Sequence, residues 1–302
     1  MKINGPLAVL ANPGAGRGRH RGVLPFVLAH LRDTGLPVEP LEARTPQEAL
    51  AACHAAVAGG AGALVVVGGD GTVHLALQAL AGTDVPLGIV PAGTGNDFAV
   101  AAGFGAPAAA LRAIGAALAR GGDHATIDLA RLTTGAGATH WFGGVLAAGF
   151  DAIVNERGNR MRWPRGPVRY DLAIMVELAR LRARSYRITL DGVTQERDAV
   201  LVAVANGGSY GGGMRICPDA DVTDGRLDVA VVRPISRRTL VKVKPQIYAG
   251  THVHHPAVDT FSARKVELAA EGIVGYADGE RIAPLPVTVE CVPGALRLLR
   301  GA

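Results

Sequence analysis

The stretch Val65–His74, VVVGGDGTVH, passes from consecutive valines into two glycines, an aspartate, a third glycine and a threonine. A run of β-branched residues predicts a buried strand, and the residues after it predict a helix from Thr72. The glycine-rich turn between them then lies at the carboxyl end of a parallel strand, where α/β sheets bind ligands. The unusual feature of this turn is Asp70, a carboxylate placed among glycines.

The same alternation of strand and helix continues on both sides of this stretch. Thr45, which precedes Pro46 and stands three residues before Glu48, is the predicted N-cap of one of the helices. The order of elements predicts a mostly parallel sheet covered by helices. The expected strands are Leu7–Asn12, Pro37–Ala43, Gly62–Gly69 and Val85–Gly93, and the expected helices begin near His20, Thr45, Thr72 and Asn96.

The pattern changes after about residue 125. Short strand-like runs joined by Gly and Asp turns follow, with one strong helix among them at Arg169–Leu181. This pattern predicts an antiparallel sandwich of about seven strands. We therefore expect a nucleotide-binding α/β domain over residues 1–125 and a β-sandwich over residues 126–294, while residues 295–302 could return to either domain.

Composition limits the classes of partner and compartment. The chain has 302 residues, 49% of them hydrophobic, and a formal charge of +5 with a pI near 9.4. Long-range attraction then favours an anionic partner, which could be nucleotide phosphate, nucleic acid or an acidic membrane leaflet. The three cysteines are too few and too far apart for a disulfide framework, so buried free thiols are expected. No apolar run reaches the roughly 20 residues of a membrane span, and a cytoplasmic protein is expected.

Three glycine-rich turns follow predicted strands, at Asn12–Arg19, Gly68–Thr72 and Pro91–Asp97. Glycine lets the backbone approach a phosphate, and the N–H groups of such a turn hold negative charge. A carboxylate beside phosphates is repelled unless Mg²⁺ or a reacting hydroxyl lies between them, so Asp70 indicates phosphoryl transfer. No turn ends in the Gly-Lys-Ser/Thr of a Walker A loop, and any one turn alone could be a plain connection.

Taken together, these motifs resemble the diacylglycerol kinase catalytic-domain family, which includes bacterial soluble lipid kinases and the sphingosine and ceramide kinases. The resemblance rests on NPGAGRGR, GGDGT and PAGTGNDFA, and on YGGGMRICPDADVTDGRLDV and GYADGE further along the chain. GGDGT by itself is shared with NAD kinases and resembles a phosphofructokinase motif. The resemblance implies a Rossmann-like N-terminal domain, a C-terminal β-sandwich and an active site in the cleft between them.

The resemblance also implies roles for particular residues. Asp70 would join a network that links a Mg²⁺-bound water to the nucleotide, with Asn96 close by. Residues expected to meet ATP are Asn12, Pro13, Gly14, Ala15, Gly16, Thr45, Gly69, Asp70, Gly71, Thr72, Thr94 and Asn96.

A catalytic base is expected near the end of the chain, because the acceptor hydroxyl must lose its proton as the phosphoryl group arrives. Asp278 and Glu280 would point to the same face if their stretch is extended. We assign the base to Glu280, with Asp278 as helper or substitute. The alternative is an ordinary Asp-Gly hairpin turn followed by an exposed glutamate.

The family's bacterial members suggest a second, structural metal site. Here the Asp224 side chain would act with the main-chain carbonyls of Asp221 and Arg226, a set of oxygen ligands that suits Mg²⁺ or Ca²⁺. A hairpin turn without an ion is an equal alternative. Other positions depart from the family's pattern, with Leu75 in place of an acidic residue, Val100 in place of an arginine, and Arg17 where some relatives have lysine.

Three further segments each allow two interpretations. The arginine-rich segment Asn155–Tyr170, which contains Trp163, could dock on an anionic membrane, or it could be a solvated loop whose tryptophan packs on the body. The helix within Ala173–Arg184 is expected to face the core, although such helices in lipid kinases can line an acyl-chain pocket. His252 and His254 would share one face if their segment is a strand, but a structural turn is favoured over a zinc site.

These observations predict an ATP- and Mg²⁺-dependent lipid kinase, with diacylglycerol as the favoured substrate and phosphatidic acid as the product. We expect peripheral contact with an anionic membrane and allow for a homodimer. No nucleic-acid partner is expected, since the sequence lacks the known nucleic-acid motifs. The alternatives are an NAD kinase, or a nucleotide- or lipid-binding module with little turnover, which Leu75 and Val100 motivate.

Overall fold

A computed structural model describes residues 3–11, 19–161, 163 and 167–300. The chain divides into two compact units. Two later segments of the chain belong to the first unit together with its N-terminal part. Unit 1 comprises Met1–Leu129, Val222–Asp224 and Val292–Ala302, and unit 2 comprises Ala130–Asp221 and Gly225–Cys291.

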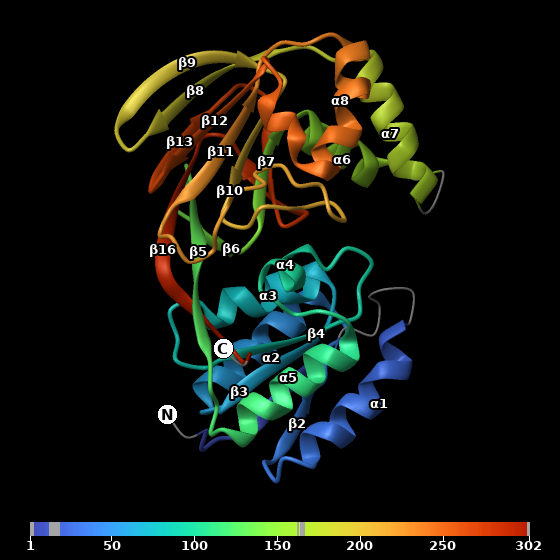
Figure 1. Ribbon diagram of the computed structural model, residues 1–302, viewed down its shortest axis with the longest axis vertical. Coiled ribbons are helices and arrows are strands. Elements are labelled where there is room, and N and C mark those ends of the chain that lie inside the picture. The colour runs from blue at the N-terminus through green and yellow to red at the C-terminus, as the bar shows by residue number, and fades with distance from the viewer. Residues whose placement is uncertain (1–2, 12–18, 162, 164–166, 301–302) are drawn as a thin grey trace. The chain divides into compact units, whose positions relative to one another are not determined.

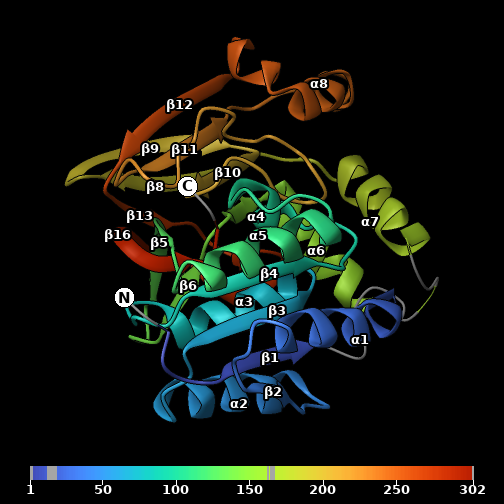
Figure 2. The ribbon, with the colours of Figure 1, turned by 60° about the horizontal axis from the view of Figure 1, so that its bottom comes forward.

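Unit 1 contains a parallel sheet in the strand order β2-β1-β3-β4; β2, β3 and β4 are labelled in Figure 1 and all four strands in Figure 2. All six residues of β3 are buried, because helices pack on the strands of this sheet (Figure 2). This burial explains why the sequence of β3 is an unbroken apolar run. The strands are β1 (Leu7–Ala11), β2 (Val38–Leu41), β3 (Ala63–Gly68) and β4 (Leu87–Pro91), and the helices are α1 (Arg19–Arg32), α2 (Pro46–Ala58), α3 (Asp70–Leu80), α4 (Asp97–Ala101) and α5 (Pro107–Ala119).

The predicted start of α2 is confirmed in detail. The Thr45 hydroxyl accepts a hydrogen bond from the Glu48 N–H at 3.2 Å, and the Glu48 carboxylate accepts the Arg44 N–H at 2.7 Å. The glutamate thus reaches one residue further back than in a standard capping box, in which it would accept the N–H of Thr45 itself.

Unit 2 is an antiparallel β-sandwich. One sheet has the order β12-β11-β10-β7-β14-β15. The other contains β9-β8-β13-β16, and β5 pairs with β16 on one side and with β6 on the other. Its strands are β5 (Ala125–Thr134), β6 (Thr139–Phe142), β7 (Val145–Gly149), β8 (Arg184–Leu190), β9 (Val193–Ala199), β10 (Leu201–Ala205), β11 (Leu227–Val232), β12 (Val258–Ala263), β13 (Lys265–Ala269), β14 (Val274–Ala277), β15 (Glu280–Pro284) and β16 (Val287–Leu298).

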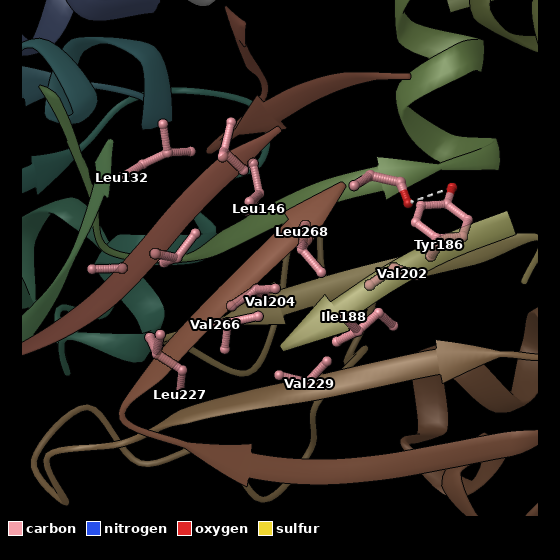
Figure 3. Close-up of a cluster of buried hydrophobic side chains, with 14 of the residues drawn as sticks. Leu132, Leu146, Tyr186, Ile188, Val202, Val204, Leu227, Val229, Val266 and Leu268 are labelled. Carbon is pink, nitrogen blue, oxygen red and sulfur yellow. Dashed lines mark hydrogen bonds between the residues drawn. The ribbon is translucent and has the colours of Figure 1, made fainter. Parts of the chain in front are cut away.

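The core of unit 2 is formed by the inner faces of these strands. Leu146, Val202 and Val204 come from one sheet, and Ile188, Val266 and Leu268 come from the other (Figure 3). The buried Tyr186 donates its hydroxyl hydrogen to the carbonyl of Ala148 at 3.2 Å, which satisfies its one polar atom inside the core.

Strands β5 and β16 each belong to both units. The first part of β16 pairs with β13 in unit 2, while Leu298 lies opposite Leu87 of β4 in unit 1. Residues 295–299 therefore lie in unit 1.

Among the described residues of its second half, the chain forms three α-helices where the sequence indicated one. Helix α7 (Pro167–Ala179) covers most of the expected range, whereas α6 (Phe150–Arg160) and α8 (Arg237–Ala249) were not expected. Glycine and polar residues interrupt the apolar pattern of α6, and the alternation of valine and lysine in α8 imitates a strand.

The histidine segment is also not a strand. Thr251–His254 form a 3₁₀ helix, in which the buried His252 Nε2 lies 3.1 Å from the carbonyl oxygen of Ile216. Burial lowers the pKa of His252. Its packing supports the favoured structural role.

Candidate functional site

The first part of the candidate site is the carboxylate of Asp70, the first residue of α3. Its Oδ2 accepts the N–H of Asn96 at 2.8 Å, and its Oδ1 accepts the N–H of Phe98 at 3.2 Å. Those two N–H groups belong to the turn that follows β4 and to the first residues of α4. Asp70 therefore connects the glycine-rich turn of one strand to that of the next.

Close approach of the two turns explains their glycines. A Cβ on Gly93 would lie 2.4 Å from the Cα of Gly69, and a Cβ on Gly69 would lie 2.9 Å from the Cα of Gly93. The Gly93 N–H also donates to Oδ1 of Asn96 at 2.9 Å, and Asn96 adopts a left-handed conformation with φ of 61°. Only residues without a side chain at 69 and 93 allow this contact.

This arrangement suits a bound phosphate and a divalent cation. The N-terminus of α3 supplies backbone N–H groups and the positive end of a helix dipole. A carboxylate oxygen offers two acceptor positions, so a carboxylate can combine hydrogen bonds to backbone N–H groups with the ligation of an ion. The carboxylate is therefore of the kind that Mg²⁺ and its water ligands prefer.

The remaining predicted nucleotide residues have different surroundings. Gly71 is half-buried in the first turn of α3, Thr72 is buried there, and Thr94 is exposed in the turn before Asn96. Thr45 is exposed at the start of α2, where its hydroxyl oxygen caps the helix. Asn12, Pro13, Gly14, Ala15, Gly16 and Arg17 lie outside the described residues.

The second part of the candidate site is the hairpin between β14 and β15 in unit 2. Asp278 and Gly279 form its two-residue turn, with φ of 51° and 84°. The condition that this stretch is extended is therefore wrong, because both central residues take positive φ, as they do in a type I′ turn. The argument that Asp278 and Glu280 share a face no longer applies.

The two carboxylates of this hairpin differ in what they contact. Asp278 accepts the N–H of Gly143 at 3.1 Å and that of Gly144 at 2.9 Å, which connects the hairpin to the residues before β7. A Cβ on Gly144 would lie 2.7 Å from Oδ1 of Asp278. Glu280 is exposed, and its side chain forms no hydrogen bond or ion pair with the described part of the chain. It is the carboxylate of the pair that remains available to take a proton.

The predicted structural metal site lies in an exposed turn. Asp221 and Asp224 are exposed, and the Arg226 guanidinium donates to the Ser262 hydroxyl at 2.7 Å and to its carbonyl at 2.9 Å. Within the described ranges, no group of three or more His, Cys, Asp or Glu side chains could hold a metal ion. The predicted set has one side chain and two carbonyls, and it stays a prediction.

One buried interaction was not expected from the sequence. The Tyr210 hydroxyl donates to Oδ2 of Asp151 at 2.6 Å, and the Ala152 N–H donates to Oδ1 at 2.9 Å. Burial raises the pKa of Asp151, while these two hydrogen bonds act against the increase. The glycines that follow Tyr210 were the only sequence signal in this region. The bond connects their loop to the start of α6.

The arginine-rich segment is largely helical rather than a loop. Arg157, at the end of α6, forms an ion pair with Glu177 of α7, and Arg160 pairs with Glu156 at 2.6 Å. Trp163 is 79% exposed, so the alternative in which it packs on the body is wrong. Arg162 and Arg165 lie outside the described residues.

Two of the three cysteines are buried, as expected from composition, and the third is not. Cys53 and Cys217 are buried free thiols, and burial raises the pKa of Cys53 to about 11, whereas Cys291 is half-buried. Among the described residues, every helix is too short or too polar to cross a bilayer.

Models of two protein families match the sequence. The diacylglycerol kinase catalytic domain matches residues 6–132, and the YegS C-terminal NAD kinase beta sandwich-like domain matches residues 144–300. A protein of Mycobacterium tuberculosis named diacylglycerol kinase is 44% identical over 98% of this chain and 95% of its own length. A relative from Stenotrophomonas maltophilia, named a probable YegS-like lipid kinase, is 28% identical over 90% of this chain and 89% of its own.

Solved structures share the fold. A diacylglycerol kinase from Bacillus anthracis superposes with a TM-score of 0.73 and 22% identity, covering 98% of this chain and 97% of that one. An NAD kinase from Archaeoglobus fulgidus, solved with ATP, superposes with a TM-score of 0.54 and 15% identity over 97% of this chain and 93% of its own. At these identities the likeness concerns the fold alone.

Proposed function

Because this chain belongs to the diacylglycerol kinase catalytic-domain family, we propose that it is an ATP- and Mg²⁺-dependent lipid kinase. The proposed reaction transfers the γ-phosphoryl group of ATP to the free hydroxyl of diacylglycerol and yields phosphatidic acid. The relative named diacylglycerol kinase, which matches nearly the whole chain, supports this choice of substrate.

The observation that carries the proposal is the pair of turns held together by Asp70. A turn that only connected a strand to a helix would not need a carboxylate that binds the next turn's backbone. In the proposed enzyme, N–H groups at the start of α3 would bind phosphate oxygens, and Asp70 would hold Mg²⁺ or a water molecule bound to it. When bound, Mg²⁺ would offset the charge of the transferring phosphoryl group.

The proposed base is Glu280. It accepts the proton of the lipid hydroxyl on a carboxylate oxygen as the oxygen–phosphorus bond forms, and ADP leaves. Asp278 acts as a positioning residue, since its two hydrogen bonds to Gly143 and Gly144 fix the hairpin that carries Glu280. An exposed glutamate directly after a two-residue turn suits a substrate that comes from a membrane.

We also propose that the ends of α6 and α7 contact the membrane. Trp163 and three residues on one side of α7, Val168, Leu172 and Met175, are exposed, with Met175 at 65%. Exposed apolar side chains beside arginines are typical of surfaces that bind the lipid interface.

The decisive experiment measures transfer of labelled γ-phosphate from ATP with Mg²⁺ to diacylglycerol, ceramide, sphingosine and NAD, the lipids being in mixed micelles. We expect labelled phosphatidic acid from the wild type. We expect Glu280→Gln to lose about 10²- to 10⁴-fold in kcat, the usual contribution of a general base. Asp70→Asn should lose activity as well and raise the KM for ATP.

Two matched variants control for loss of charge alone. Glu271→Gln removes an exposed carboxylate from the same unit as Glu280, and Asp33→Asn removes one from the same unit as Asp70. Both should retain wild-type rates. Label in NADP would replace the proposal with an NAD kinase, and the absence of label in every product would leave a binding module.

A further inference from the structure

Helix α8 has an outer face that the lipid kinase reaction does not explain. The helix begins at a Ser236 N-cap, whose hydroxyl oxygen accepts the Thr239 N–H at 3.1 Å, and it ends at Gly250, with φ of 77°. Val243 on its inner side is buried, and Ile247 packs against a hydrophobic cluster of the sandwich. The helix is therefore a firmly attached part of unit 2.

The opposite face combines apolar side chains with cations. Val241, Pro245 and Tyr248 are spaced by four and three residues, so they follow one side of the helix, and Val241 is 55% and Tyr248 46% exposed. Successive residues lie about 100° apart around a helix, so four exposed cations flank this stripe on both sides. They are Arg237 and Lys244 on one side and Arg238 and Lys242 on the other.

The charge of this segment is one-sided. Residues 229–258 include Arg233 and the four cations of α8 but no aspartate or glutamate. None of the four α8 cations forms an ion pair with a residue in the described ranges. The four charges therefore face solvent without an acidic partner.

The exposed residues of α8 do not contribute to the stability of the helix. Arg237 and Arg238 lie in the first turn, where the helix dipole disfavours positive charge. A proline inside the helix and exposed Val and Tyr side chains also cost stability without packing on the sandwich. A stripe of apolar residues with cations along both edges is instead the pattern of a helix that lies in the interface of an anionic membrane.

We propose that the outer face of α8 docks on an anionic lipid bilayer, with Val241, Pro245 and Tyr248 entering the interface and the four cations contacting lipid phosphates. In both ribbon views α8 and α7 lie at the end of the sandwich opposite the β8–β9 hairpin (Figures 1 and 2). This surface would hold the proposed kinase at the membrane that contains its substrate. The inference thus deepens the proposed function, but docking itself requires no catalysis.

The test is sedimentation of the full-length protein with vesicles, without ATP. Vesicles of phosphatidylcholine alone are compared with vesicles that contain 30 to 40 mol% phosphatidylglycerol, roughly the fraction that gives a strongly negative leaflet. We expect binding only to the anionic vesicles. The variant Arg238→Gln/Lys242→Gln should lower the partition coefficient about 30-fold, as expected for the loss of two charges near such a surface.

A second variant tests insertion rather than attraction. Val241→Ser/Tyr248→Ser keeps all four cations, so it should weaken binding even in high salt, where charge is screened. The matched control is Arg112→Gln/Arg264→Gln, which removes two exposed cations elsewhere and should bind vesicles like the wild type. Equal unfolding midpoints for all variants exclude misfolding as the cause.

Two results would overturn the inference. The first is unchanged vesicle binding by both α8 variants. The second is a change in self-association, measured by sedimentation velocity, without a change in vesicle binding, which would make this face a contact between copies of the chain. Phosphorylation of a short-chain, monomeric diacylglycerol distinguishes membrane docking from catalysis. This substrate requires no membrane, so the α8 variants should phosphorylate it at the wild-type rate.

Discussion

At the scale of single residues, the turn that contains Asp70 was predictable from the local sequence, whereas its neighbour Asn96 was expected only from the family resemblance and Phe98 was not expected. The valines before Gly68 and the glycines around Asp70 indicate a strand, a turn and a helix from local sequence alone. The N–H groups that Asp70 binds belong to residues 26 and 28 positions later in the chain. Contacts at that separation depend on how parallel strands are arranged, and one sequence does not encode this in a readable pattern.

The two carboxylates of the β14–β15 hairpin should separate stability from catalysis. Asp278 is held by two backbone N–H groups, whereas Glu280 is exposed. We expect Asp278→Asn to lower the free energy of unfolding by about 1–3 kcal/mol, because a hydrogen bond to a charged group is lost. Glu280→Gln should change it by less than about 0.5 kcal/mol, as is usual for an exposed residue. Urea unfolding measures both, and equal losses would contradict the assignment of Asp278 as the positioning residue.

The contact between Gly69 and Gly93 gives a second prediction at this scale. In Gly93→Ala, the new methyl group would lie 2.4 Å from the Cα of Gly69. The two turns must then move apart, so we expect a sharp loss of ATP affinity and a lower unfolding midpoint. Gly105→Ala is the control, since nothing lies within 4 Å of its added Cβ. ATP binding by isothermal calorimetry decides the matter, and similar affinities for the two variants would remove the turns from the proposed nucleotide site.

At the scale of elements, prediction succeeded where the local pattern agreed with the tertiary environment. Helix α2 begins at the predicted cap because Thr45, Pro46 and Glu48 act within a single turn. Helix α8 was missed because valine and lysine alternate along it, and only the packing of Val243 and Ile247 against the sandwich selects a helix. The histidine segment was expected as a structural turn, and the 3₁₀ helix that it forms was not predicted for a related reason, since the burial of His252 is a tertiary effect.

The hydrogen bond between Tyr210 and Asp151 predicts a pH-dependent effect on the connection between the glycine-rich loop and α6. In Tyr210→Phe, the buried carboxylate loses the donor that favours its ionised form, so its pKa rises further. The stabilisation that this bond provides is present above the pKa of the Asp151 carboxyl and is lost as the pH falls through it. We therefore expect Tyr210→Phe to cost about 1–3 kcal/mol at pH 8 and less at low pH.

Chemical denaturation of the wild type and Tyr210→Phe from pH 4 to pH 8 measures this dependence. The control is Tyr248→Phe, which removes the hydroxyl of an exposed tyrosine. A cost that is the same at every pH would mean that the ring of Tyr210, rather than its bond to Asp151, stabilises the loop.

At the scale of the whole molecule, the sequence indicated a change of architecture but not how the chain is divided. The change from alternating strands and helices to successive strands is visible near residue 125. The return of Val222–Asp224 to unit 1 is not visible, although in the structure the Asp128 N–H donates to the carbonyl of Val222 at 2.7 Å. A three-residue segment is too short to show a hydrophobic periodicity from which its spatial neighbours could be predicted.

The division into units leads to a prediction about which ligand stabilises which part of the molecule. The turns proposed to bind nucleotide lie in unit 1, and the Glu280 hairpin lies in unit 2. ATP with Mg²⁺ at 100 times its dissociation constant should stabilise the native state by about 3 kcal/mol, because it binds the folded protein only. In hydrogen exchange, the added protection should appear in residues 68–73 and 91–100. Glu280→Gln should keep this protection and Asp70→Asn should lose it, because Asp70 alone of the two connects the turns. If Asp70→Asn were protected as strongly as the wild type, the nucleotide would bind without the network on which the proposed function rests.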